Sequence, residues 1–163
     1  MAIKRRKSEN LGRDSYDYPG GTINWREVVP DEPGHWPGIF GNAETEQMVT
    51  REKCGSKQTV MGRSVYHPGD HHEPHVHFYA EEIMYCLSGK GVVGSGDKEY
   101  LLVPGDVQFS KIGEVHWLRN PFTEPVEFIW IYSGASMPME SGYATSEIFD
   151  EGMEIYKKNN KVK

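Results

Sequence analysis

Short apolar runs separated by turn-forming residues occupy the middle of the chain. The apolar runs cover residues 60–66, 83–87, 91–93, 100–103, 107–109, 115–118 and 126–132. Glycine, proline, serine, asparagine and aspartate fill gaps at residues 68–70, 88–89, 94–97, 104–106 and 120–121. Short runs with turn residues at regular spacing are typical of an antiparallel β-sandwich or barrel. The pattern therefore predicts an all-β fold for this part of the chain.

The run at residues 126–132 illustrates how such a strand divides its side chains between two faces. Val126, Phe128, Trp130 and Tyr132 share one face, and Glu127, Ile129 and Ile131 share the other. Successive side chains of a strand point to opposite faces of the sheet. One of these faces must line the barrel interior, which would give an apolar, partly aromatic pocket. The expected pocket residues are Met84, Phe128 and Trp130.

The two ends of the chain differ from the middle. Residues 1–18 are polar and predict a flexible N-terminal arm. Residues 19–56 combine four prolines with Trp25 and Trp36, which predicts an irregular or extended segment packed on the barrel. The barrel itself is expected over residues 57–135. Residues 136–163 are expected to form a tail with a short helix at 145–158.

Length and charge limit the classes of function. The chain has 163 residues, about the size of one domain. A net charge of -6 and a pI near 5.6 argue against a nucleic-acid partner, which requires a basic surface. No apolar stretch approaches the roughly 20 residues of a membrane span, and the N-terminus lacks the apolar core of a signal peptide. We therefore expect a cytoplasmic protein without a membrane partner, with Cys54 and Cys86 as free thiols.

Potential metal ligands are concentrated in one short stretch of the chain. His75 and His77 are two residues apart, so on a strand both side chains leave the same face. Glu82 follows after a gap long enough for a turn, and His116 offers a fourth ligand. Imidazole nitrogens with one carboxylate suit a first-row transition metal and leave coordination positions open for water or substrate.

The spacing of these residues resembles the sequence pattern of the cupin superfamily. The first cupin motif, G-x5-H-x-H-x(3,4)-E-x6-G, is matched by Gly69, His75, His77, Glu82 and Gly89. The second, G-x5-P-x-G-x2-H-x3-N, is matched by Gly105, Gly113, His116 and Asn120, with Lys111 in place of the proline. Fifteen residues separate the motifs, as in compact bacterial cupins. The chain thus resembles a small single-domain bacterial-type cupin with a cupin 2-like conserved barrel.

This resemblance implies a double-stranded antiparallel β-helix, or jelly-roll barrel, and a metal site. The implied ligands are His75, His77, Glu82 and His116. One divalent transition metal per chain is expected, among iron, manganese, nickel, cobalt, zinc and copper, with iron favoured. Glu81 competes for the carboxylate position, but only Glu82 leaves six residues before Gly89. Small cupins commonly pair, so a homodimer is expected.

Three residues near these ligands are candidates for catalysis. His71 would act as a general base near the pocket mouth, or lie in solvent at the rim. Arg63 would clamp a substrate carboxylate or phosphate, or lie on the outer face. Tyr79 lies two residues after His77, so on a continued strand its side chain would share the face of the ligand histidines, but it lies at a turn between strands. Some lyase-type cupins carry a tyrosine base where this chain has Met84, which argues against a tyrosine-based elimination.

Two classes of function fit these features. The first is a mononuclear metal-dependent cupin enzyme acting on a small organic molecule. An Fe(II)-type dioxygenase is favoured within this class, because an aromatic cavity suits an aromatic or diketone substrate. A non-redox isomerase, lyase or decarboxylase is the alternative. The second class is a non-catalytic cupin that binds or senses a small molecule.

Overall fold

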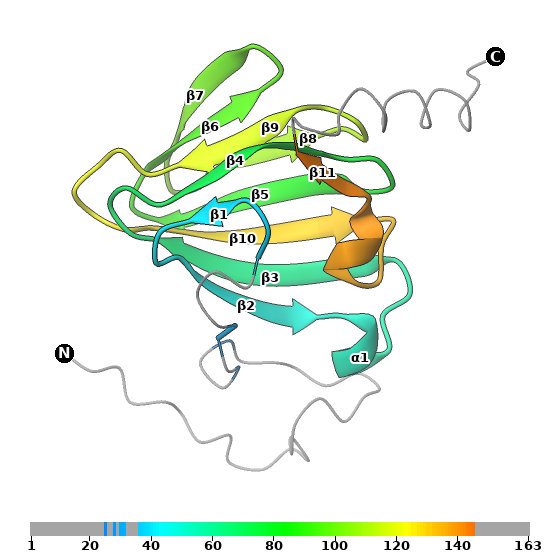
Figure 1. Ribbon diagram of the computed structural model, residues 1–163. Coiled ribbons are helices and arrows are strands. Elements are labelled where there is room, and N and C mark those ends of the chain that lie inside the picture. Colours follow the sequence, from blue (N-terminus) through cyan, green and yellow to red (C-terminus); the bar gives the residue numbers. More distant parts are fainter. Residues whose placement is uncertain (1–24, 26–27, 29, 32–35, 146–163) are drawn as a thin grey trace.

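Two antiparallel β-sheets face each other and form a jelly-roll barrel in the computed structural model (Figure 1). The structure describes residues 25, 28, 30–31 and 36–145. One sheet contains, in spatial order, β1 (Ile39–Phe40), β4 (His71–His77), β9 (His116–Arg119), β6 (Gly91–Ser95) and β7 (Lys98–Leu102), with β11 (Tyr143–Thr145) also paired to β4. The other contains β2 (Glu44–Val49), β3 (Thr59–Tyr66), β10 (Val126–Ser133), β5 (Glu81–Ser88) and β8 (Val107–Ser110). The expected all-β barrel is confirmed.

Strand β10 lies in the middle of the second sheet and shows why the barrel has an apolar interior. It pairs with β3 on one side and with β5 on the other. Its buried residues are Val126, Phe128, Trp130 and Tyr132. The aromatic face is therefore the one that lines the barrel, while Ile129 and Ile131 on the opposite face remain partly exposed.

Strand β2 lies in the segment that we expected to be irregular or extended. It is an edge strand of six residues, paired to β3 with a register shift between Gln47 and Val49. Its inward Thr45 hydroxyl lies 3.0 Å from the Ser64 hydroxyl, and its outward Glu46 pairs with Arg63. Because polar partners across the sheet satisfy these side chains, the strand needs few apolar residues. The apolar pattern of the sequence therefore does not reveal it.

The C-terminal part of the described chain also adds regular structure to the barrel. The 3-10 helix η2 (Pro138–Ser141) leads into β11, which pairs with the ligand-bearing end of β4 (Figure 1). The predicted arm at residues 1–18 lies outside the described residues, as does nearly all of the predicted helix at 145–158, whose first residue ends β11. The boundaries proposed for the four segments of the chain remain predictions.

Helices are a minor part of the described chain. Helix α1 (Arg51–Cys54) is capped at its N-terminus by Thr50, whose side-chain hydroxyl accepts a hydrogen bond from the Lys53 amide at 3.1 Å. Both α1 and η2 have four residues, and no described helix has the length and apolar character needed to cross a bilayer. Cys54 and Cys86 are buried free thiols, as expected.

Candidate metal centre

Four side chains from three strands meet inside the barrel. They are His75 and His77 of β4, Glu82 of β5 and His116 of β9. One ligand atom from each lies within 4.8 Å of the corresponding atoms of the others. All four residues are buried, with exposed fractions of 6% for Glu82 and 2% or less for the histidines. The structure therefore brings together the set expected from the sequence.

Strand geometry explains how residues far apart in sequence converge. The alternation of β4 directs His75 and His77 to the same face, and the pairing of β4 with β9 sets His75 directly opposite His116. The register of this pairing shifts between His72 and His75, where Pro74 cannot donate a ladder hydrogen bond. Glu82 is buried in the adjoining sheet and Glu81 is only partly buried, which identifies Glu82 as the carboxylate of the cluster.

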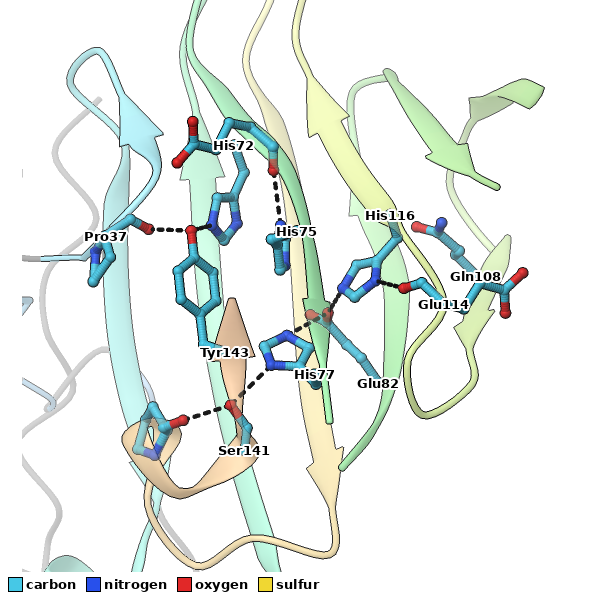
Figure 2. Close-up of polar contacts among 12 residues, drawn as sticks. Pro37, His72, His75, His77, Glu82, Gln108, Glu114, His116, Ser141 and Tyr143 are labelled. Carbon is cyan, nitrogen blue, oxygen red and sulfur yellow. Dashed lines mark hydrogen bonds and ion pairs between the residues drawn. The ribbon is translucent and has the colours of Figure 1, made fainter. Parts of the chain in front are cut away.

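The Nδ1 atom of each histidine has a hydrogen-bond partner outside the cluster. His75 Nδ1 lies 2.8 Å from the Glu73 carbonyl, and His116 Nδ1 lies 2.8 Å from the Glu114 carbonyl. A carbonyl oxygen only accepts, so both Nδ1 atoms carry hydrogen and Nε2 faces the centre. His77 Nδ1 lies 2.8 Å from the Ser141 hydroxyl instead (Figure 2).

The Nε2 atoms show whether a metal ion fits here. His75 Nε2 and His77 Nε2 are buried and have no hydrogen-bond partner. His116 Nε2 lies 2.6 Å from Glu82 Oε2, and His77 Nε2 lies 3.4 Å from the same oxygen (Figure 2). Buried polar atoms without a partner are rare and need an explanation such as an ion. Three imidazoles and one carboxylate are a donor set for a divalent transition metal, so the residues fit such an ion.

The electrostatics of the cluster support a cation. Burial alone would raise the pKa of Glu82, but the hydrogen bond with His116 and the closeness of the His116 and His77 imidazoles hold that pKa well below its usual range. Burial opposes charge on His116, yet the contact with Glu82 raises the pKa of that imidazole. Burial lowers the pKa of His75, which favours the neutral ring that a metal requires. The carboxylate is therefore anionic and holds positive charge beside it.

A small cavity of about 30 Å³ adjoins the cluster. The lining includes three of the four cluster residues, namely His75, Glu82 and His116. Met84, Phe128 and Trp130 line it as expected, and so do Trp36, Thr45, Ser64, Tyr66, His72 and Tyr132. Among the described residues of this lining there is no lysine or arginine. The cavity is therefore narrow, largely aromatic and next to the candidate ligands.

The three catalytic candidates do not join the cluster. Arg63 lies on the outer face of its sheet, where Nη1 is 2.9 Å from Glu46 and Nε is 2.6 Å from Glu127. His71 is exposed and stacks on the Phe40 ring with 5.0 Å between centroids. Tyr79 is 53% exposed at the turn before β5. None of the three lines the cavity.

Three residues near the cluster had no assigned place in the sequence pattern. The His72 ring stacks on His75 with 3.9 Å between centroids and lines the cavity. Its Nε2 lies 3.3 Å from the Tyr143 hydroxyl, which donates to the Pro37 carbonyl at 3.1 Å. Ser141 and Tyr143 lie more than 60 residues after the ligand histidines they approach, so no local motif could reveal them.

The chain matches known proteins over its barrel. Residues 62–132 match the cupin domain family. An oxalate-binding protein of Thermotoga maritima is 28% identical over 110 residues, which is 68% of this chain and 91% of that protein. A crystal structure of a predicted oxalate decarboxylase from Thermotoga maritima has a TM-score of 0.64 and 26% identity, and covers 69% of this chain and 98% of its own.

A more distant structure agrees on the fold alone. A polyketide cyclase from Streptomyces resistomycificus has a TM-score of 0.65 at 18% identity, with 77% of this chain and 84% of that chain covered. The family match spans β10 and the strands that carry all four candidate ligands, and the barrel agrees with solved structures over most of its length. Residues 62–132, the part of the chain that contains all four candidate ligands, are therefore similar to a cupin domain.

Proposed function

We propose that this cupin binds one divalent transition metal through His75, His77, Glu82 and His116, and that the metal site receives a small carboxylic acid. The pair of buried Nε2 atoms without a partner, on His75 and His77, is the observation that carries the proposal. Both lie beside an anionic carboxylate, within 4.8 Å of the other ligand atoms. A cation at this point would satisfy both imidazoles and neutralise the carboxylate.

The size of the cavity supports a small ligand. A volume of about 30 Å³ exceeds the space for one water molecule but is far below that of a typical drug-sized pocket. The similarity to an oxalate-binding protein and to a predicted oxalate decarboxylase supports a compact carboxylic acid as the ligand. Since the described lining offers no cationic side chain, the metal would supply the positive charge for the carboxylate.

The residues of the chain would bind and shield this ligand. The aromatic wall formed by Phe128, Trp130 and Tyr132 excludes water and strengthens electrostatic contacts within the cavity. The Trp130 indole donates to the Ser64 hydroxyl at 3.1 Å, which holds a polar group on the same wall. A divalent ion bound at the four ligands would supply Lewis acidity, and redox chemistry if it were iron or manganese. Because one similar structure is that of a predicted oxalate decarboxylase, a non-redox lyase of the decarboxylase type is the enzyme activity to test first.

An Fe(II)-type dioxygenase remains the second candidate. It rests on the same donor set, which leaves coordination positions open, and on the aromatic lining of the cavity. The small volume weighs against a large aromatic substrate unless the cavity opens. The homodimer and the cytoplasmic location stay predictions.

Metal analysis and ligand binding test the proposal together. Protein purified without added metal should contain close to one transition-metal ion per chain, and the manganese-loaded protein should bind oxalate saturably by calorimetry. His75→Ala should lose both properties. His67→Ala is the matched control, because His67 is an exposed histidine that pairs with Glu44 away from the cluster. If wild-type protein takes up no divalent metal, the proposal fails.

Oxygen consumption separates the two candidate activities. Iron-loaded protein should consume no oxygen with oxalate, and release of carbon dioxide from oxalate would support the decarboxylase. Oxygen uptake with a small β-diketone or a catechol, abolished by His75→Ala and retained by His67→Ala, would instead favour the dioxygenase.

A further inference from the structure

We infer that Ser141 is a positioning residue, which fixes the His77 ring in the form that presents the Nε2 lone pair to the metal site. This inference rests on the proposed metal site for its function, although the ring geometry exists without a metal. Ser141 is fully buried, and its hydroxyl lies 2.8 Å from His77 Nδ1. The residue lies beyond the part of the chain that matches the cupin domain family.

The partner of His77 Nδ1 is a hydroxyl, and a hydroxyl alone does not determine which ring nitrogen carries the hydrogen. His75 and His116 face backbone carbonyls, which only accept, so hydrogen must be on Nδ1 of each. A serine hydroxyl both donates and accepts. If Ser141 donated its hydrogen to His77 Nδ1, the ring hydrogen would be on Nε2, and that atom could not bind a metal.

The Pro138 carbonyl removes this ambiguity. The Ser141 hydroxyl donates to it at 2.7 Å, and a hydroxyl has only one hydrogen to give. Its oxygen must therefore accept from His77 Nδ1, which places the ring hydrogen on Nδ1. The lone pair of Nε2 is then directed toward Glu82 Oε2, 3.4 Å away (Figure 2).

The 3-10 helix that carries Ser141 is hydrogen-bonded to the two residues that follow β4. The Tyr79 amide donates to the Ser141 carbonyl at 2.9 Å, and the Phe78 amide donates to the Gly142 carbonyl at 3.1 Å. Gly142 has a φ of 73°, and a Cβ there would lie 2.6 Å from the Tyr79 ring. This close approach holds the hydroxyl over His77 and gives η2 a role in the metal site.

Ring-nitrogen NMR and metal titration of Ser141→Ala test the inference. In metal-free wild-type protein, at a pH where the ring is neutral, two-bond proton–nitrogen spectra should show hydrogen on Nδ1 of His77. The His77 signals are assigned as those that are missing from the spectrum of His77→Gln. Ser141→Ala should shift His77 toward hydrogen on Nε2 and weaken manganese binding by about 10- to 100-fold, the range for loss of such a partner. Ser141→Cys, with a weaker donor and acceptor, should fall between the two and serves if the alanine variant does not fold.

Ser110→Ala is the matched control. Its hydroxyl is equally buried, makes no hydrogen bond and does not line the cavity. This variant should retain the wild-type His77 spectrum and manganese affinity. Unchanged manganese affinity together with an unchanged His77 ring form in Ser141→Ala would overturn the inference. If wild-type protein bound no metal, the proposed function would fail, whereas the NMR comparison would still decide the role of Ser141.

Discussion

Two buried clusters of charged groups occupy opposite faces of the same sheet, and they differ in how completely their atoms are paired. On the outer face, Arg63 pairs with Glu46 at 2.9 Å and with Glu127 at 2.6 Å. The Trp25 ring covers the guanidinium, with 3.7 Å from Cζ to the ring centroid. The guanidinium therefore has carboxylate partners on two strands and an aromatic ring above it.

On the inner face, the polar atoms around Glu82 are only partly paired. Glu82 has His116 at 2.6 Å, but the Nε2 atoms of His75 and His77 have no hydrogen-bond partner. The outer cluster contains a guanidinium paired with two carboxylates, whereas the inner one leaves two imidazole nitrogens without a partner beside a carboxylate. The comparison teaches that unmet hydrogen-bonding capacity, rather than burial or charge alone, distinguishes a candidate binding site from a structural ion cluster.

The largest expected effect comes from removing the cation of the outer cluster. Arg63→Ala should lower the free energy of unfolding by about 3–5 kcal/mol, because two carboxylates lose their buried partner. Chemical denaturation measures this change. Arg119→Ala is the control, because its ion pair with Glu99 is about 40% exposed on each side (41% and 43%) and should contribute less than about 1 kcal/mol. Manganese affinity should not change in folded Arg63→Ala, and a loss there would place Arg63 in the site.

The next largest effect comes from neutralising the inner carboxylate. Glu82→Gln should weaken manganese binding by at least about 100-fold, because it removes the only anionic ligand of the set. This loss is larger than the one expected when a ligand only loses its hydrogen-bond partner. Glu46→Gln is the matched variant, because Glu46 is equally buried but belongs to the outer cluster. Isothermal titration should show unchanged manganese affinity for it. Equal losses in the two variants would contradict the division into a structural and a binding cluster.

The smallest expected effect is the dependence of metal affinity on pH. The pKa of His116 is raised mainly by its contact with Glu82, although burial opposes this, so the metal-free site favours the protonated ring. A metal must displace that proton, and affinity should therefore fall as the pH falls below the raised pKa. The expected loss is up to about tenfold per pH unit for one released proton. Titrations in buffers of different ionisation enthalpy would count the proton, and a pH-independent affinity would contradict the displacement of a proton from His116.

The barrel could be predicted from the sequence largely because its interior follows strand periodicity. Phe128 and Trp130 alternate with partly exposed residues, and turn residues separate the strands, so local pattern and tertiary position agree. Strand β2 could not be predicted in this way, because most of its buried side chains are polar. Its Thr45 and Glu46 are buried through polar pairing with Ser64 and Arg63, which an apolar pattern does not register.

The side on which Arg63 lies was decided by the sheet rather than by the residue itself. An arginine on a strand next to a metal motif suits a substrate clamp as well as a surface position. The register of β3 against β2 and β10 places it directly opposite Glu46 and diagonal to Glu127, which is opposite Val65. Charge pairing across neighbouring strands then holds it on the outer face, away from the cavity.

By itself the sequence determined the class of fold through strand periodicity, and the four candidate ligands through strand spacing and the resemblance to the two cupin motifs. Two histidines at i and i+2 share a face wherever the strand lies. The tertiary structure alone decided which atoms remain unpaired, how narrow the cavity is, and which residues hold the ligands. Ser141 reaches His77 only because β11 pairs with β4 and carries η2 with it. Such contacts arise from the packing of segments distant in sequence, and no local pattern records them.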